Sequence, residues 1–324
     1  MRLCILSDCS GPTNPTYPGH GLGQAVHRIA TYLDAIGHDV TLVASEGSAF
    51  NGALLTPVIS GVGYEGESIL AQAAYTAHQD RAFDVFLDCT HTHILSSLFP
   101  QLPVANMYHD IYQPVARCPI VVSFAQKALM PEWADTARVV YNTVNPAPFS
   151  LGEAQRYAVY MGMVRDYKNP ILAIEACAIA GLPLKIAGPF PGDNHLGIGQ
   201  FTNCEYIGPV SGDAKASLLR GASVLLQLGH AESFGLSTVE AGLCGVPVVA
   251  LPSGGNMDII EHGKNGAFVP LSGRRCQAVA DAMQVAMSVD RAACREYAMR
   301  YTDGLTQAEL MSDILTEVAQ GERW

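Results

Sequence analysis

The chain has 324 residues, 49% of them hydrophobic, which is enough to build two domains of ordinary size and excludes a disordered chain. Its net charge of −11, without a cluster of Lys or Arg, disfavours nucleic acids and anionic membrane surfaces as partners. No apolar run reaches the roughly 20 residues that span a bilayer, and the nine cysteines include no Cys-x-x-Cys pair. We therefore expect a cytoplasmic protein with reduced thiols, no zinc site and no integral membrane segment.

Short apolar runs alternate with helical patterns through the first half of the chain. Strands are expected at residues 3–6, 39–44, 85–87, 104–107 and 120–123, and helices at 23–36, 67–78 and 93–98. Strands that alternate with helices predict a doubly wound parallel sheet, and continuous runs of Val, Ile and Leu fit strands that are buried on both faces.

The alternation stops at residues 142–149, where Asn and two prolines predict an extended linker. It restarts with strands expected at 157–161, 184–187, 204–207, 224–228, 246–250 and near 268–269, and with helices near 170–180, 213–220, 237–244 and 277–288. A last amphipathic stretch covers residues 305–320. We predict an α/β protein with two Rossmann-like, doubly wound parallel-sheet domains. The active site should lie in the cleft between them, where the strands end.

Two carboxylates bracket a loop that opens into a helix within residues 230–255. Glu232 precedes the predicted helix, and Glu240 lies about two turns inside it. Backbone amides and the positive end of the helix dipole form a ready phosphate site at such a helix start. The residues at this start are Ser233, Phe234, Gly235 and Leu236. Glu240 would accept hydrogen bonds from ribose hydroxyls, and Glu232 would hold another polyol. A buried helix between two short loops would give the same apolar pattern.

This segment is in register with the E-x7-E region of the family 4 retaining glycosyltransferases, and the chain resembles that family. The matching positions are 232, 234–236, 240–241, 245–249 and 254–255. The resemblance implies the GT-B fold, in which two Rossmann-like domains face each other across a cleft. It also implies an acceptor-side domain at residues 1–146, a nucleotide-sugar donor domain at 147–302, and a final helix, about 303–324, that packs back on the first domain.

The same resemblance implies a reaction. A hexosyl group would move, with retention at the anomeric carbon, from a UDP- or GDP-linked nucleotide diphosphate sugar to a hydroxyl of a small or soluble acceptor. Such a site requires neither a cofactor nor a metal ion. The alternatives are a catalytically inactive nucleotide-sugar-binding module and a sugar phosphorylase or epimerase on the same scaffold. A measurement of donor turnover distinguishes them.

In the expected donor domain, a segment resembles the family's G-R-x4-K motif, which neutralises the donor diphosphate. Gly162 and Lys168 align with this motif, but Met163 stands where the family has arginine, and Arg165 is the candidate to replace it. Lys168 is the expected counter-charge of the leaving diphosphate, with a solvated loop lysine as the alternative. Gly188 and Val210 follow two other expected strands of this domain. The family holds the nucleotide base at these places through backbone contacts, so the resemblance implies the same role here.

In the expected acceptor domain, Gly21 and Gly23 follow the first strand, and glycines allow backbone amides to approach an anion closely. The resembling family has a glycine-rich loop here that faces the donor diphosphate and the acceptor. A tight strand-to-helix turn is the alternative. Val26 stands where a dinucleotide fingerprint has its third glycine, which disfavours NAD as a ligand.

Histidines follow two other strands of this domain. The resemblance implies that His91 or His93, preferably His91, touches the donor sugar beside the anomeric carbon. His109 and Asp110 follow the next strand, where the family often has a histidine on the acceptor side. A metal site that joins Asp88 to the first two histidines is disfavoured, because the sequence supplies no complete ligand set.

Overall fold

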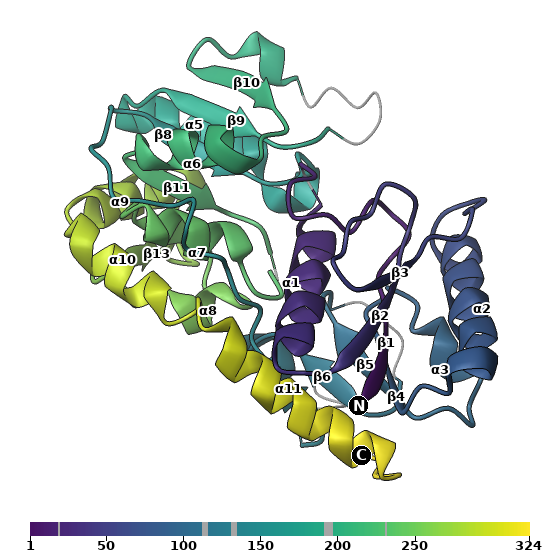
Figure 1. Cartoon of the computed structure of the whole chain (residues 1–324). Coiled ribbons are helices and arrows are strands. Elements are labelled where there is room, and N and C mark those ends of the chain that lie inside the picture. The colour runs from purple at the N-terminus through teal and green to yellow at the C-terminus, as the bar shows by residue number, and fades with distance from the viewer. Residues whose placement is uncertain (19, 112–115, 131–134, 191–196, 231) are drawn as a thin grey trace. The chain divides into compact units, whose positions relative to one another are not determined.

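The computed structural model describes residues 1–18, 20–111, 116–130, 135–190, 197–230 and 232–324. They divide into two compact units (Figure 1). Unit 1 combines Met1–Thr143 with Asp303–Trp324, and unit 2 is Val144–Thr302. Each unit contains one sheet, and the described strand pairings in both sheets are parallel, as the alternation of strands and helices predicts.

The described strands of unit 1 form a seven-stranded sheet in the order β3-β2-β1-β4-β5-β6-β7. Their bounds are β1 (Arg2–Leu6), β2 (Asp39–Val43), β3 (Ala53–Leu55), β4 (Val85–Asp88), β5 (Val104–Tyr108), β6 (Pro119–Val121) and β7 (Arg138–Val139). In the centre of this sheet, Leu3 of β1 is paired with Val40 on one side and with Val85 on the other. The residues of β1 after Arg2 are buried, as expected for a strand covered on both faces.

The described helices of unit 1 are α1 (Gly21–Ala35), α2 (Tyr64–Arg81), α3 (Ile94–Leu98), α4 (Phe124–Ala128) and α11 (Gly304–Ala319). Helix α11 lies beside α1 and also contacts β4 and β5 (Figure 1). A Cβ atom at Gly304 would lie 2.1 Å from the ring of Tyr32, so the glycine allows α11 to begin in close contact with α1. His38 and Ser312 add a hydrogen-bonding contact of 2.9 Å between Nε2 and Oγ. The helix that completes unit 1 therefore follows unit 2 in the sequence.

The described strands of unit 2 form a six-stranded sheet in the order β10-β9-β8-β11-β12-β13. Their bounds are β8 (Ala158–Met161), β9 (Leu184–Ala187), β10 (Cys204–Gly208), β11 (Val224–Gln227), β12 (Val248–Ala250) and β13 (Gly266–Phe268). The helices are α5 (Pro170–Ala180), α6 (Gly212–Arg220), α7 (Leu236–Leu243), α8 (Asn256–Ile259), α9 (Arg275–Met287) and α10 (Arg291–Met299).

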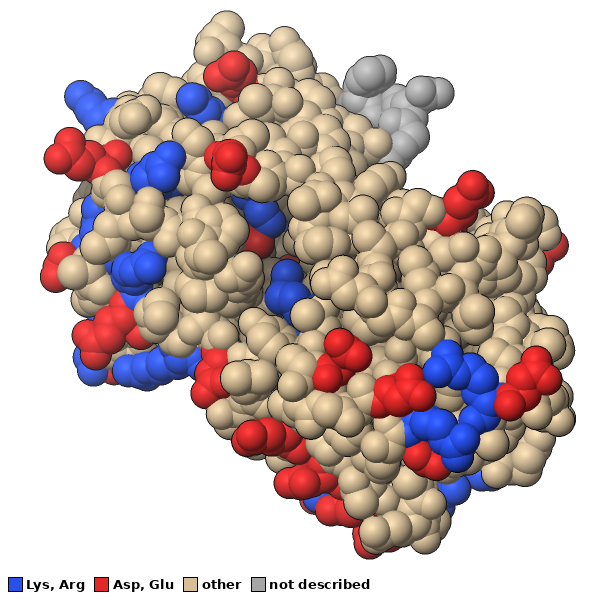
Figure 2. Space-filling model, in the orientation of Figure 1, with Lys and Arg blue, Asp and Glu red and all other residues tan. Residues whose placement is uncertain are grey.

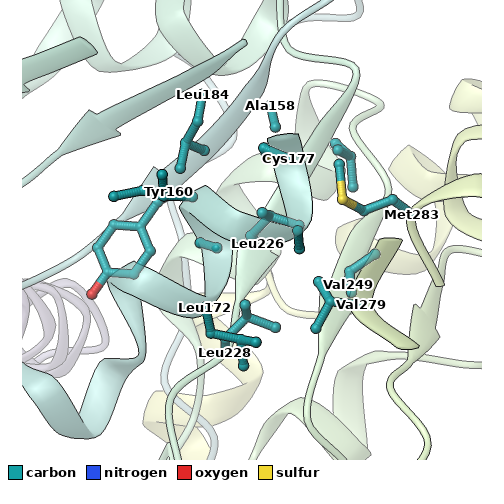
Figure 3. Close-up of a cluster of buried hydrophobic side chains, with 14 of the residues drawn as sticks. Ala158, Tyr160, Leu172, Cys177, Leu184, Leu226, Leu228, Val249, Val279 and Met283 are labelled. Carbon is teal, nitrogen blue, oxygen red and sulfur yellow. The ribbon is translucent and has the colours of Figure 1, made fainter. Parts of the chain in front are cut away.

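The core of unit 2 lies between the sheet and helices α5 and α9 (Figure 3). Leu226 and Val249 of the central strands pack with Leu172 and Cys177 of α5 and with Met283 of α9. All these side chains are buried. This core is built entirely from residues of unit 2, so the unit has the apolar contacts that an independent fold requires.

The sequence pattern missed elements that are short or weakly apolar. Strand β3 has three half-buried residues and α4 has five residues, so neither produces a clear apolar run. The pattern does not predict helix α10 either, because only Cys294 and Ala298 of its nine residues are buried. The nine cysteines are all free in the structure, and six of them are buried.

Candidate functional site

In unit 2, Lys168 and Glu232 are paired at the end of the sheet where strands β8 and β11 finish. The Lys168 Nζ atom lies 2.6 Å from Glu232 Oε2, and the side chains are 19% and 20% exposed. Asn169, next to Lys168, donates a hydrogen bond from Nδ2 to the Leu228 carbonyl at 2.7 Å. The loop after β8 is thereby attached to the end of β11, which fixes the ammonium group beside the carboxylate.

A second ion pair joins helices α6 and α7. The Lys215 Nζ atom lies 2.5 Å from Glu240 Oε1, with the side chains only 14% and 7% exposed. Glu240 is the fifth residue of α7, so it lies little more than one turn inside the helix; the predicted two turns are wrong, because the helix begins at Leu236. Lys215 was not selected from the sequence. In the sequence, Lys215 is a single cation within a predicted helix, and such a residue is typical of a solvent-exposed helix face.

The start of α7 presents backbone rather than side chains. Gly235 caps the helix with φ of 107°, a left-handed conformation that favours glycine. Thr238 donates its amide to the Gly235 carbonyl at 3.0 Å, so the amides of Leu236 and Ser237 precede the first hydrogen bond of the helix. Phe234 is buried, and its ring packs edge-on against Tyr301 with centroids 5.7 Å apart. The Phe234 side chain thus anchors the segment, and an anion could meet only its backbone.

The glycine pair after β12 closes on the segment before α7. Gly255 donates its amide to the Glu232 carbonyl at 2.6 Å. A Cβ atom at Gly254 would lie 2.1 Å from the Glu232 carbonyl oxygen, and one at Gly255 would lie 2.3 Å from that of Phe234. Only glycines permit this approach, so the 254–255 loop sets the position of Glu232.

Glycines also dominate the ends of β8, β9 and β10. A Cβ atom at Gly188 would lie 1.8 Å from the Gly162 carbonyl oxygen, and Gly188 donates its amide to Gly208 at 3.0 Å. Val210 is half-buried just beyond this point, whereas Arg165 is exposed on the loop that leads to Lys168. The structure therefore brings Gly162 and Gly188 together and pairs Lys168, not Arg165, with Glu232.

In unit 1, a buried carboxylate follows β1. Asp8 lies within 3.0 Å of His20 Nε2 through Oδ1 and accepts a hydrogen bond from Ser10 Oγ at 2.6 Å through Oδ2. Burial raises the pKa of the Asp8 carboxyl, but the bonds from His20 and Ser10 outweigh burial and leave its pKa below the usual value. Burial lowers the pKa of His20, yet its bond to Asp8 and the Asp8 charge leave that pKa raised.

A second buried carboxylate, Glu67 of α2, holds the loop that follows β4. It accepts hydrogen bonds from the His91 amide at 2.9 Å, from the Thr92 amide at 2.8 Å and from Thr92 Oγ1 at 2.6 Å. His91 Nδ1 lies 3.4 Å from both Glu67 Oε1 and Asp8 Oδ2. The bond to Glu67 is the main cause of a raised His91 pKa. The His91 side chain is 42% exposed, so its other edge faces outward.

The other candidate residues that follow β1, β4 and β5 are two histidines, His93 and His109, and two glycines, Gly21 and Gly23. His93 is buried with its ring 4.0 Å from that of Tyr108, so His91 is the outward-facing member of the pair. Burial lowers the pKa of His109 to about 3, and its Nε2 atom is buried without a hydrogen-bond partner in the described part of the chain.

Gly21 is the first residue of helix α1. A Cβ atom at Gly23 would lie 2.4 Å from His20 Nδ1, so this glycine makes room for the His20 ring.

The sequence pattern does not predict three residues of these clusters: Asp8, His20 and Glu67. Asp8 and His20 stand in the expected strand-to-helix segment, but nothing in the sequence shows that they pair. Glu67 lies 24 residues before the His91 amide that it binds. Only the parallel topology, which places β1 and β4 side by side, brings these groups to one edge.

Comparisons with known proteins fit this arrangement. Residues 143–300, nearly all of unit 2, match the family model described as Glycosyl transferases group 1. The D-inositol 3-phosphate glycosyltransferase of Mycolicibacterium gilvum is 33% identical over 135 residues, which are 38% of this chain and 30% of that protein. The protein of the same name from Mycolicibacterium smegmatis is 30% identical over 136 residues, covering 38% of this chain and 31% of the relative. The chain thus spans less than a third of the length of these two relatives.

Three solved structures resemble the whole chain. AviGT4, a glycosyltransferase involved in avilamycin A biosynthesis, has a TM-score of 0.78 at 20% identity and covers 100% of this chain and 99% of its own. HepE of Anabaena, in complex with UDP and glucose, has a TM-score of 0.73 at 19% identity, covering 98% and 99%. Sucrose-phosphate synthase of Thermosynechococcus elongatus scores 0.79 at 16% identity, covering 99% and 100%. The predicted GT-B fold is confirmed.

Figure 2 shows acidic and basic side chains mixed over the visible face. Within the described ranges, no helix is long and apolar enough to cross a membrane. The same residues contain no group of three or more His, Cys, Asp or Glu side chains placed to hold a metal ion.

Proposed function

We propose that the chain is a retaining glycosyltransferase that transfers a hexosyl group from a nucleotide diphosphate sugar, UDP- or GDP-linked, to a hydroxyl of a small or soluble acceptor. The observation that carries the proposal is the donor constellation of unit 2, where Lys168 pairs with Glu232 and Lys215 pairs with Glu240 around the start of α7. The match to Glycosyl transferases group 1 covers the same residues. UDP and glucose in the HepE structure support a nucleotide sugar as the ligand.

Each part of this constellation suits one part of the donor. The ammonium of Lys168 would stabilise the diphosphate as it leaves, because the group carries about two negative charges that water only partly screens in a closed site. The first amides of α7 add hydrogen bonds to the same anion. Glu240 would accept ribose hydroxyls, and Glu232 would accept hydroxyls of the sugar. When a donor binds, Lys168 would share its charge between Glu232 and the phosphate.

Unit 1 would supply the acceptor side. We assign the contact with the donor sugar to His91 and the approach of backbone amides to Gly21 and Gly23. Retention would need no protein nucleophile, since the leaving phosphate can accept the proton of the attacking hydroxyl. Catalysis would then depend on positioning and on stabilising the diphosphate charge. Nine free cysteines favour a reducing compartment, and we extend the proposal to the cytoplasm.

A thermal-shift series with UDP, GDP and ADP tests the donor site first. A nucleotide at 100 times its dissociation constant should add about 2.7 kcal/mol of stability. At equal concentrations, the nucleotide that stabilises the chain most identifies the donor class. Turnover of the matching nucleotide sugars and the anomeric proton coupling of the product come next. Binding without turnover would favour the inactive binding module, and an inverted product would contradict the retaining mechanism.

Lys168→Met tests the diphosphate contact. The variant should lose most of its turnover while it keeps its fold. Lys264→Met is the matched control, because Lys264 also pairs with a glutamate of unit 2, Glu261, but both side chains are exposed. Equal turnover in the two variants would remove Lys168 from the site, and loss of turnover in Arg165→Met alone would transfer its role to Arg165.

A further inference from the structure

Two carboxylates and two histidines meet at the edge of the unit 1 sheet where β1 and β4 end. The side chains of Asp8 and Glu67 are 1% exposed, whereas His91, which touches both, is 42% exposed. His20 contacts Asp8 from the residue before α1. The protonation of the two histidines therefore decides the net charge of this cluster.

The bonds of His20 define its charge. Its Nδ1 atom lies 3.1 Å from the Pro12 carbonyl oxygen, which can only accept a hydrogen bond. Its Nε2 atom lies 3.0 Å from the Asp8 carboxylate, and the Ser10 hydroxyl already donates its proton to that carboxylate. The Ser10 oxygen, 3.2 Å from Nε2, has given its proton to Asp8 and faces the ring as an acceptor. Both ring nitrogens thus face acceptors, and we assign His20 as the imidazolium that satisfies them and neutralises Asp8.

Glu67 then has one negative charge to be balanced. The Thr92 hydroxyl and the amides of His91 and Thr92 are neutral donors. The ion pair of Glu67 in the described part of the chain is with His91 Nδ1. A buried carboxylate without a counter-charge is costly, so the cluster is satisfied when His91 also carries a proton on each nitrogen.

The other charged and titratable groups near His91 do not reverse this balance. Asp110, after β5, adds a negative charge that favours the imidazolium. His109 is neutral because burial lowers its pKa to about 3. The positive charges of His20 and His91 oppose each other, and Asp8 lies between them as a common partner.

We propose that Glu67 and Asp8 are positioning residues that hold His91 as an imidazolium, so that its outward Nε2–H donates a hydrogen bond to an oxygen of the substrate and does not act as a general base. The assignment deepens the glycosyl-transfer function proposed above and rests on it for the identity of the substrate. A neutral His91 with its proton on Nδ1 would present a lone pair at Nε2 instead, as a general base requires. The two states predict opposite pH profiles.

The first experiment measures the titration of His91 without any substrate. Proton and nitrogen resonances of the histidine ring are followed by NMR in the full chain, and His91→Gln identifies the His91 signal by its loss. We expect His91 to titrate above an ordinary histidine, and Glu67→Gln and Asp8→Asn each to move its midpoint to lower pH. Glu65→Gln is the matched control, because Glu65 also stands in the first turn of α2 but is exposed. It should leave the midpoint unchanged.

The second experiment measures turnover against pH for the same variants. The rate should be high below the His91 midpoint and fall as pH rises through it, and Glu67→Gln should move this fall to lower pH with a severalfold loss near neutrality. Circular dichroism and nucleotide affinity should remain close to those of Glu65→Gln. A merely structural Glu67 would lower the rate equally at every pH.

Two results would overturn the assignment. One is a His91 midpoint that is the same in the native chain, Glu67→Gln and Asp8→Asn. The other is a rate that rises with pH through the His91 midpoint, which would identify Nε2 as a base. If no nucleotide sugar is turned over, the proposed function fails, but the NMR titration still decides whether the carboxylates hold His91 protonated.

Discussion

Lys215 and Glu240 form a buried ion pair, and the proposed function gives this pair a role in nucleotide binding as well as in stability. Lys215→Met would leave the Glu240 carboxylate buried without its counter-charge, and we expect a loss of about 3 kcal/mol in the free energy of unfolding. Nucleotide affinity should fall as well, because the carboxylate would be displaced or protonated. Urea unfolding and nucleotide thermal shifts measure the two effects.

The double variant Lys215→Met/Glu240→Gln separates the two roles. It removes both charges, so much of the lost stability should return. Nucleotide affinity should stay low, since a neutral amide replaces the charged acceptor of the ribose hydroxyls. Recovery of both properties would show that the pair serves the fold alone.

His20 should make the stability of unit 1 dependent on pH on the alkaline side. Its pKa in the folded chain is raised above the ordinary value of 6.5 through its bond to Asp8, although burial opposes the shift. A raised pKa gives a stabilisation that is complete below 6.5 and is lost as pH rises through the folded-state value. His20→Gln should therefore flatten the alkaline decline of the urea midpoint, measured in steps of pH upward from 6.5.

His27, within helix α1 that begins just after His20, provides a control of opposite sign. Burial lowers the pKa of His27, so its contribution to stability is lost as pH falls, not as it rises. His27→Gln should leave the alkaline decline in place. An unchanged alkaline decline in His20→Gln would contradict the imidazolium assigned to His20.

At the scale of single elements, the loop after β12 positions the segment before α7. Gly254→Ala should weaken nucleotide binding more than it weakens the fold, because the new methyl group would lie 2.1 Å from the Glu232 carbonyl oxygen and displace that residue. Gly263→Ala is the matched control, since Gly263 also has a positive φ, 78°, but nothing lies within 4 Å of its Cβ position. Equal loss of affinity in both variants would mean that backbone strain, not Glu232, is responsible.

The elements that the sequence predicts well are those with strong apolar periodicity. The strands around β1 and β11 are continuous buried runs, and their parallel order follows from the helices between them. Strand β3 and helix α10 lack such a signal because few of their side chains are buried. They do contact neighbouring elements, β2 in the case of β3 and α7 in the case of α10, but such contacts are not visible in a local sequence pattern.

The sequence predicts candidate-site residues that share one segment, but not the contacts that join residues of different segments. Glu232 and Glu240 stand eight positions apart in one recognisable motif. The partner of Glu240, Lys215, lies 25 residues away on another helix, and Glu67 reaches the His91 amide across 24 residues. No local pattern encodes such pairs, since they depend on which strand ends the parallel sheet places together.

At the scale of the whole molecule, unit 2 is one continuous segment of the chain, whereas unit 1 is built from two separate segments. The continuous segment of unit 2 contains its own core and all four charged residues that we assign to the proposed donor site. The isolated fragment 144–302 should therefore unfold cooperatively and keep part of the nucleotide affinity. Circular dichroism melts with and without the nucleotide test this expectation, and a fragment without a cooperative transition would contradict it.

The first segment of unit 1 should not fold when it is expressed alone. A fragment that ends at Thr143 lacks α11, whose Met311, Ile314, Leu315 and Val318 are buried. The surfaces of α1, β4 and β5 that α11 covers would be exposed to water, and we expect the fragment to aggregate. Addition of a peptide of residues 303–324 should restore part of its solubility, as measured by light scattering.

The position of α11 near the end of the sequence also determines which unit can finish folding first while the chain is being synthesised. The strands of unit 1 emerge from the ribosome first, yet they must wait for a helix that is translated only after all of unit 2. Unit 2 can close its own core as soon as it emerges, so the segment made second should finish folding first, against the usual amino-to-carboxyl order. Until then the nascent amino-terminal strands present the apolar surface that chaperones bind.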